Sequence, residues 1–292
     1  TMRQLAGTGL VPRPIVTRGG EEISRHGPHF VRLITSLDGA PMGEAVLRSD
    51  ALLRDLGRTV GLMDRTLAEF DHPALHRAFH WDLATAPAVI EQRLPLVRDD
   101  EIRGLIAHAL EVHRTMVAPR LAACRRAAIH GDVNDYNVLV DRHAQRVTGI
   151  VDFGDMVVSH TVNDVAIAMA YAALGMTDPV GAAAMVAAGY HAVYPLTEDE
   201  VAALHGLMLL RLGLSVCVAA VQQAERPDQD YLGISQGPIR TTLPALVAVH
   251  PRLAHYRLRD ACGLAPVPHA PRIVAWLGEH GPRAARLTGH DL

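Results

Sequence analysis

The spacing of apolar positions divides the chain into a short region typical of β-strands and a long region typical of helices. Up to residue 40, short apolar runs separated by turn residues predict strands at 15–17, 21–24 and 29–37, after the end of a helix that stops at Gly9. Beyond that point apolar residues recur at helical spacing. The segments predicted to be helical are 41–70, 88–94, 99–120, 163–174, 178–194, 197–223, 236–250, 252–262 and 272–279.

A stretch in the middle of the chain departs from the helical period. It contains, in order, a strand end at 128–129, a polar loop at 130–136, an apolar strand at 137–140 and a β-branched strand at 147–151. Two short apolar strands joined by a turn form a hairpin. Because a hairpin holds its two ends side by side, we expect Asp132, Asn137 and Asp152 to converge on one pocket.

The residue types in this expected pocket indicate its chemistry. Two carboxylates and an amide, with no Cys or His between them, are hard oxygen ligands that suit magnesium carrying a nucleotide better than zinc. In phosphoryl transfer one Asp accepts the hydroxyl proton, while an Asn and a second Asp hold the metal on the phosphates. The spacing of Asp132, Asn137 and Asp152 fits these three roles.

Two motifs in the same stretch carry a resemblance to a known family. Residues 130–137 (HGDVNDYN), followed by residues 151–155 (VDFGD), resemble the aminoglycoside phosphotransferase/choline kinase superfamily, which has the protein-kinase-like fold. The resemblance implies that Asp132 is the catalytic base and that Asn137 and Asp152 hold Mg²⁺. It also implies ATP or GTP as the phosphoryl donor.

Further segments are similar to the hydroxylysine kinase branch of this superfamily. They are residues 79–83 (FHWDL), 152–157, 163–171 and 251–257. This similarity implies a small cationic acceptor that bears a hydroxyl group, such as an amino alcohol or a hydroxy amino acid. Relatives of the branch also occur as kinase parts of fused proteins, so the chain is expected to come from a longer polypeptide with further modules downstream.

The resemblance also defines the expected fold and domains. The fold class is α+β, a bilobal protein-kinase-like fold whose small β lobe looks truncated and whose large lobe is mostly helical around the catalytic hairpin. We expect residues 1–40 to be a remnant of the nucleotide-binding lobe and hinge, 41–265 the catalytic lobe, and 266–292 a Pro-rich joint with a terminal helix. The Gly-rich loop, the phosphate-pairing Lys and the helix Glu of such kinases are not found in the chain, as if about fifty to seventy preceding residues were missing.

Several residues are candidates for binding. In the resembled family, backbone groups around Thr35, Ser36 and Leu37 bind the nucleotide base, although a plain edge hairpin would have the same pattern. An ammonium-bearing acceptor needs a carboxylate, which Asp155 and Asp135 could supply, and both also suit turns.

Other polar residues have structural interpretations. Trp81 either walls the acceptor pocket or plugs a loop onto a helix. Asp164 is expected to be a structural carboxylate near a helix start. The charged residues of segment 41–70 are expected to be solvated; they are Arg54, Asp55, Arg58, Asp64 and Arg65.

Composition excludes several classes of protein. The net charge is −3 and dispersed, which does not favour nucleic acid as a partner. The three cysteines, Cys124, Cys217 and Cys262, lie far apart and favour a reducing, cytoplasmic location. The longest apolar run, 204–220, carries His205 and Arg211 and is interpreted as too polar to cross a membrane.

The motifs leave some functions open. The acceptor could instead be homoserine, choline, ethanolamine, an aminoglycoside or a peptide side chain. A non-catalytic kinase-like scaffold would have no need of Asp132, Asn137 and Asp152 together. A metal-dependent hydrolase fits less well, because no His-rich or dinuclear ligand pattern is present.

Overall fold

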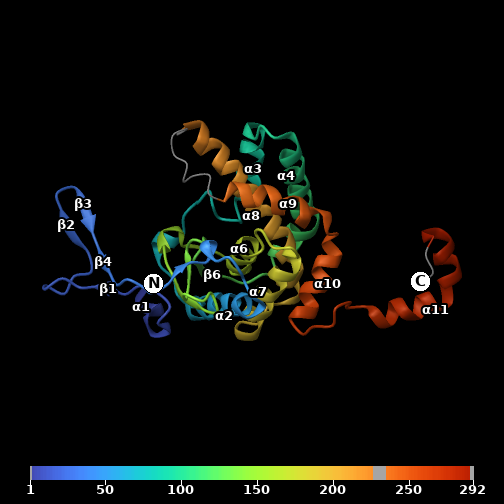
Figure 1. Cartoon of the computed structure of the whole chain (residues 1–292), viewed down its shortest axis with the longest axis horizontal. Helices are drawn as coiled ribbons and strands as arrows, with labels where there is room; N and C mark the ends of the chain where they lie inside the picture. Colours follow the sequence, from blue (N-terminus) through green and yellow to red (C-terminus); the bar gives the residue numbers. More distant parts are fainter. Residues whose placement is uncertain (1, 226–234, 290–292) are drawn as a thin grey trace.

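The computed structural model describes residues 2–225 and 235–289. Its centre is a helical body that holds the predicted hairpin, and two smaller parts project from opposite ends of the body (Figure 1). One is an arm of short strands near the N-terminus, and the other is the last helix. The break between helices at residues 226–234 lies outside the described residues.

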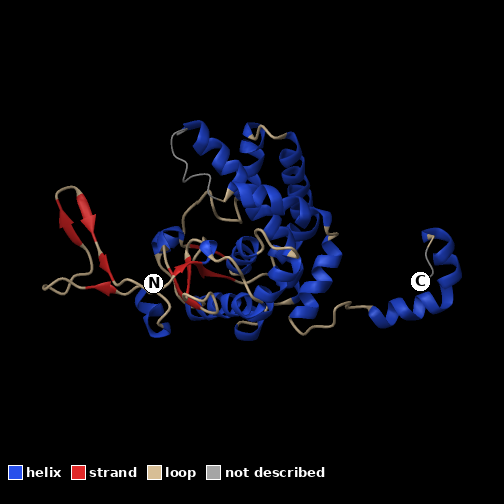
Figure 2. Ribbon diagram, in the orientation of Figure 1, coloured by secondary structure: helices blue, strands red, loops and turns tan. Residues whose placement is uncertain are grey.

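The helices confirm the predicted pattern of a mostly helical protein (Figure 2). The α-helices are α1 (Met2–Leu5), α2 (Asp50–Leu67), α3 (Ala86–Arg93), α4 (Asp100–Val112), α5 (Ala118–Leu121), α6 (Val162–Ala172), α7 (Pro179–Val193), α8 (Glu198–Glu225), α9 (Gln236–Ala248), α10 (Pro251–Ala261) and α11 (Ala270–Thr288). Shorter helical turns are η1 (Ala6–Thr8), η2 (Met42–Glu44), η3 (Pro73–Leu75), η4 (Leu94–Leu96), the π-helical η5 (His113–Val117) and η6 (Phe153–Asp155).

The strands of the described residues form four small antiparallel sheets. The strands are β1 (Pro14–Ile15), β2 (Ser24–His26), β3 (His29–Val31), β4 (Leu33–Ile34), β5 (Ala40–Pro41), β6 (Arg126–Ile129), β7 (Val138–Val140), β8 (Val147–Ile150) and β9 (Val157–His160). The pairs are β1 with β4, β2 with β3, and β6 with β9, while β7 lies between β5 and β8.

The predicted hairpin is the pair β7–β8, in which Val138 faces Ile150 across the two strands. Buried β-branched side chains favour these strands. The strand β9 was not predicted from the sequence. Its backbone pairs with β6 and places the segment after Asp152 beside the strand before Asp132.

Local signals explain where several helices begin and end. The helix predicted at 41–70 is α2, which begins only after Ser49, whose side chain accepts a hydrogen bond from the backbone N–H of Leu52 at 3.2 Å. Residues 99–120 begin as the helix α4, capped by Asp99, and then pass into the π-helical turn η5 before Pro119, which has no N–H to continue the ladder. The last helix, predicted at 272–279, is longer and runs over Ala270–Thr288.

The core of the body is built by α6, α7 and α8. Every residue of α6 is buried, and α6 packs against both α7 and α8. By length and composition, α8 is long and apolar enough to cross a membrane. The interpretation that this segment is too polar to do so was therefore wrong as far as composition is concerned. In the folded protein 94% of its most apolar window is buried, as in the core helix of a globular domain.

Helix α2 lies unusually close to α7. A Cβ atom added at Gly57 would lie 1.9 Å from the carbonyl oxygen of Val186, and one added at Gly189 would lie 1.9 Å from the carbonyl oxygen of Arg54. Only glycine therefore allows the two backbones to touch. This contact holds α2 directly against α7.

The projecting parts expose apolar side chains. In the N-terminal arm, the side chains of Phe30 and Leu33 are 77% and 61% exposed. On α11, which stands away from the body (Figure 1), Val274 is 67% exposed. The role of residues 266–292 as a link to a further module stays a prediction.

We expect Gly57→Ala and Gly189→Ala each to lower the free energy of unfolding by about 1–3 kcal/mol or more, because the added methyl group collides with backbone atoms. Urea denaturation measures this change. The control is Gly104→Ala in α4, where nothing lies within 4 Å of the added Cβ, and its stability should stay level or rise slightly. Equal effects at all three positions would contradict the close α2–α7 contact.

Candidate active site

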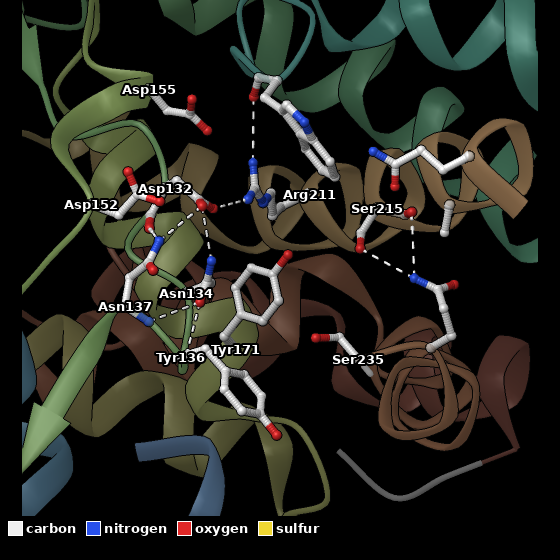
Figure 3. Close-up of a pocket in the computed structure, with 14 residues that line it drawn as sticks. Asp132, Asn134, Tyr136, Asn137, Asp152, Asp155, Tyr171, Arg211, Ser215 and Ser235 are labelled. Atoms are coloured by element: carbon white, nitrogen blue, oxygen red, sulfur yellow. Dashed lines mark hydrogen bonds and ion pairs between the residues drawn. The ribbon is translucent and has the colours of Figure 1, made fainter. Parts of the chain in front are cut away.

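A pocket of about 360 Å³ lies where the loops around the catalytic hairpin face helices α6 and α8 (Figure 3). Its lining includes Asp132, Asn134, Asn137, Asp152 and Asp155 from the loops, and Trp81, Tyr171, Arg211, Ser215, Gln222 and Gln236 from elsewhere in the chain. The structure therefore brings Asp132, Asn137 and Asp152 together, as the hairpin geometry implies. Their catalytic and metal-binding roles stay predictions.

Asp132 is the most highly connected carboxylate of this pocket. Its Oδ2 accepts hydrogen bonds from the side-chain amides of Asn134 at 2.9 Å and Asn137 at 3.0 Å. Its Oδ1 forms an ion pair with Arg211. The Asn134 carbonyl oxygen in turn accepts the backbone N–H groups of Tyr136 and Asn137, so the loop is folded around the carboxylate. These contacts fix the direction in which Asp132 faces the pocket.

The start of the loop is held from behind by Asp164. Its two carboxylate oxygens accept the backbone N–H groups of His130 and Gly131, each at 2.7 Å. Gly131 has a φ of +82°, and a Cβ there would lie 2.8 Å from the carbonyl oxygen of Asp155. The expectation that Asp164 is a structural carboxylate agrees with this geometry.

A second buried carboxyl group, Asp64 of α2, lies behind Asp164. Asp64 is fully buried, so the expectation that it is solvated was wrong. Burial, followed by the nearby charge of Asp164, raises the pKa of Asp64 well above its ordinary value. The raised pKa favours the neutral carboxyl group, which can donate a hydrogen bond to Asp164, and the Tyr190 hydroxyl donates to Asp64 at 2.7 Å. Asp55 was also placed on the solvated face, yet its carboxylate accepts the backbone N–H of Val147 at 2.9 Å.

His130 links this loop to the segment that carries Asp152. Its Nδ1 accepts the backbone N–H of Asp132 at 3.2 Å, which leaves Nε2 to donate to the carbonyl oxygen of Val151 at 3.0 Å. The His130 ring also meets the ring of Phe153 edge to face, with the ring centres 4.7 Å apart. The two halves of the site are thus joined by one neutral imidazole.

The residues around Asp152 fit a hard cation. Asp152 has a φ of +61°, a conformation that non-glycine residues rarely adopt and that clusters at functional sites. The Asn137 amide nitrogen is bonded to Asp132, which leaves its carbonyl oxygen free to act as a ligand. Burial, then the charges of Asp132 and Asp152, raise the pKa of Asp155. This excess of negative charge is what a bound cation would neutralise.

The protein alone does not complete a metal site. Among residues 2–225 and 235–289, no group of three or more His, Cys, Asp and Glu side chains is arranged to hold an ion. This agrees with magnesium chemistry at phosphates, in which one or two protein ligands share the ion with the substrate and water. Asn137 and Asp152 are the two side chains that would hold it.

Arg211 is a charged residue of the pocket that the sequence analysis did not assign to the site. It comes from α8, is 2% exposed, and its guanidinium lies over the Trp81 ring at 4.7 Å from the ring centre. The signal in the sequence was a single arginine within an apolar run, which was used only to judge membrane insertion. A fully buried arginine needs a charged partner, and here that partner is Asp132.

Trp81 lines the pocket and is also fixed to the fold. The neighbouring Asp82 is buried, accepts a hydrogen bond from the Ser159 hydroxyl at 2.6 Å and so ties the segment to β9. The Trp81 ring lines the pocket and lies against Arg211 of helix α8, while its segment is anchored to β9 through Asp82. A role of Trp81 in acceptor binding stays a prediction.

Two sets of residues that were predicted to bind the acceptor or the nucleotide lie outside this pocket. Asp135 is buried, is not among the residues that line the pocket, and forms an ion pair with Arg48 at 3.4 Å. Burial raises its pKa to about 6, although Arg48 lowers it. Thr35, Ser36 and Leu37 line a separate hollow of about 280 Å³ next to the N-terminal segment. A methyl group of Leu37 approaches Gly149, so this segment lies against β8 of the catalytic hairpin.

The architecture and the pocket together define a class of protein. A polar pocket lies where a β-hairpin and its loops meet a mostly helical body, which is the arrangement expected for the protein-kinase-like fold. The sequence matches the phosphotransferase enzyme family over residues 1–204. The chain therefore belongs to this family.

Individual relatives support the same assignment. The chain is 32% identical over 219 residues to a hydroxylysine kinase of Mus musculus, covering 71% of this chain and 58% of the relative. It is 30% identical over 245 residues to a hydroxylysine kinase of Xenopus laevis, covering 76% and 65%. The chain thus spans roughly three fifths of the length of these curated relatives. The resemblance to the hydroxylysine kinase branch is confirmed.

A solved structure with a similar fold is an amicoumacin kinase in complex with AMP-PNP, Ca²⁺ and amicoumacin, at a TM-score of 0.56 and 16% identity. The match covers 84% of this chain and 75% of that chain. At this identity the likeness concerns the fold, and it confirms the predicted fold class.

We expect Asp64→Asn to become more stable relative to the wild type as the pH rises. The folded protein keeps the proton on Asp64 above the ordinary pKa of 3.8, where the unfolded chain has lost it, so the wild type loses stability with rising pH up to the raised pKa. The asparagine amide can still donate to Asp164 and does not titrate. The difference in unfolding free energy should grow by at most about 1.4 kcal/mol per pH unit.

Urea denaturation at about pH 5 and about pH 7 measures this difference. The exposed Asp100→Asn is the control, because that side chain is 85% exposed. The change in unfolding free energy caused by Asp100→Asn should be the same at both pH values. A pH-independent effect of Asp64→Asn would show that Asp64 is ionised in the folded protein.

Proposed function

We propose that the protein is a small-molecule kinase that transfers the γ-phosphate of ATP or GTP to the hydroxyl of a hydroxylysine-like amino alcohol or hydroxy amino acid. The observation that supports this most is the convergence of Asp132, Asn137 and Asp152 on one pocket. Family membership and the hydroxylysine kinase relatives support the same reaction class. The acceptor itself is inferred from those relatives.

In the proposed mechanism Asp132 accepts the proton of the acceptor hydroxyl. Its Oδ2 is held by two amide donors, so the carboxylate is positioned before the substrate arrives. The hydroxyl oxygen can then attack the γ-phosphoryl group in line with the leaving oxygen. Asn137 and Asp152 would hold Mg²⁺. When it is bound, this ion would neutralise negative charge on the phosphates.

We propose that the nucleotide base lies at Thr35, Ser36 and Leu37. This segment leads through β5 to the catalytic hairpin, because Ala40 pairs with Val140 of β7. The sequence contains no lysine, so no lysine within these 292 residues can pair with the phosphates. The activity should therefore be measured both for these 292 residues and for the full natural polypeptide.

Asp155 is the proposed partner of the acceptor's ammonium group. It lines the pocket and, among the described residues, has no hydrogen-bond or ion-pair partner. An ammonium group placed beside it would offset the repulsion that it receives from Asp132 and Asp152. Asp135 is less suited to this role, because its carboxylate is buried against Arg48.

We expect Asp132→Asn to lower the rate of phosphoryl transfer by about 10²–10⁴-fold, because the amide cannot accept the hydroxyl proton. Asp152→Asn should raise the magnesium concentration needed for activity. Transfer of ³³P from ATP and from GTP to hydroxylysine, homoserine, ethanolamine, choline and an aminoglycoside measures both effects and ranks the acceptors.

The control for these variants is Asp141→Asn in the turn of the same hairpin, where the carboxylate caps the turn far from the reaction. This variant should keep its activity. Transfer that survives in Asp132→Asn would assign the base to another residue. No transfer to any acceptor, from the 292 residues or from the full polypeptide, would favour a non-catalytic scaffold.

A further inference from the structure

Arg211 has more hydrogen-bonding capacity than the protein uses. Its guanidinium pairs with Asp132, donates to the carbonyl oxygen of Trp81 at 3.4 Å, and lies beside the Tyr171 ring. Its Nε is buried and has no acceptor among the described residues. An unsatisfied buried donor is costly, and a ligand oxygen that accepted from it would remove this cost.

The position of Arg211 places this donor at the reaction centre. Figure 3 shows the guanidinium between Asp132 on one side and Ser215 on the other. The rings of Trp81 and Tyr171 lie 4.7 and 5.4 Å from the guanidinium carbon, so the group is held in place by two aromatic walls. Its charge therefore faces the pocket in a fixed direction, with the planar geometry that suits a carboxylate.

The charges of the pocket match a zwitterion that bears a hydroxyl group. Asp155 offers an unpartnered carboxylate, and Arg211 offers a cation with a free N–H group. Ser215 and Gln222 add neutral polar groups to the same lining. An amino alcohol without a carboxylate would use Asp155 but would leave the donor on Arg211 unsatisfied.

We propose that Arg211 binds the carboxylate of the acceptor, so that the preferred substrate is a hydroxy amino acid rather than an amino alcohol. The proposal rests on the proposed kinase function and makes it more specific. The acceptor carboxylate competes with Asp132 for the guanidinium. Binding of the correct acceptor thereby frees Oδ1 of Asp132 beside the hydroxyl whose proton it accepts.

The same competition means that Arg211 suppresses nucleotide hydrolysis while no acceptor is bound. While the guanidinium neutralises Asp132, a water molecule in the pocket is poorly activated, and nucleotide hydrolysis without an acceptor stays slow. Arg211 thus both selects the acceptor and couples the availability of the base to its presence.

The first test compares two acceptors with the wild-type protein at its full natural length. Hydroxylysine and its decarboxylated counterpart, a hydroxy diamine, differ only in the carboxylate. Because a hydrogen-bonded charge pair contributes about 1.5–3 kcal/mol, the KM for hydroxylysine should be about 10- to 100-fold lower. Equal KM values with measurable turnover of both acceptors would overturn the proposal and leave the kinase function intact. If neither acceptor is phosphorylated, the result contradicts both the carboxylate-binding proposal and the proposed kinase function.

The second test uses Arg211→Gln. It should raise the KM for hydroxylysine towards that for the hydroxy diamine, leave the KM for the diamine within about twofold, and increase nucleotide hydrolysis in the absence of acceptor. Arg240→Gln, in an exposed ion pair with Asp99, is the matched control and should change none of these values. A purely structural role for Arg211 would raise both KM values or lower kcat for both acceptors alike.

A binding measurement keeps the proposal testable if Arg211→Gln does not fold. The sequence has two tryptophans, and Trp81 lies against Arg211 while Trp276 is on α11. In a Trp276→Phe background the fluorescence reports Trp81 alone. Hydroxylysine should change this fluorescence at a lower concentration than the hydroxy diamine does, and identical titrations would contradict carboxylate binding by Arg211.

Discussion

The hydrogen bonds from the backbone of His130 and Gly131 to Asp164 are the constraint on which the candidate active site depends. They take the chain from β6 into the catalytic loop at a fixed angle, with both carboxylate oxygens used at 2.7 Å. A buried carboxylate is costly without such partners, and the neutral Asp64 supplies another. Because α2 carries Asp64, the close contact of α2 with α7 also supports the loop. The position of Asp132 therefore depends in part on α2 and α7, which do not themselves reach the pocket.

A second feature of the site is its charge balance. Asp132, Asp152 and Asp155 line one pocket, and Arg211 is the buried cation placed among them. Structural stability alone would favour an apolar replacement for such a group. In the proposed function the excess charge has a use, since it attracts both a metal ion and an ammonium group. The ion pair of Arg211 with Asp132 then belongs to the enzyme without an acceptor, and it exchanges partners when an acceptor with a carboxylate binds.

The sequence predicted the parts of the fold that depend on local pattern. Alternating apolar residues and the turn between them identified the β7–β8 hairpin, and its geometry implied that Asp132, Asn137 and Asp152 meet. The predicted helix starts at 99 and 197 agree with the structure, where Asp99 and Thr197 accept capping hydrogen bonds, because capping is a local interaction. Residues whose surroundings come from distant segments were assigned less well. Asp64 has the helical spacing of a surface residue, yet it is buried by α6 and α7, and the direction of Asp135 is set by Arg48. Arg211 reaches the pocket only because α8 packs against α6, which no local pattern reveals.

The most direct test of the central claim, that this pocket is a phosphoryl-transfer site, is a crystal structure with Mn²⁺ and a non-hydrolysable ATP analogue. Anomalous scattering locates Mn²⁺ independently of any assumption about its ligands. We expect an anomalous peak for an ion coordinated by the Asn137 side-chain oxygen, the Asp152 carboxylate and the nucleotide phosphates, with Asp132 facing the γ-phosphate. A metal ion and nucleotide bound elsewhere, with this pocket empty, would contradict it.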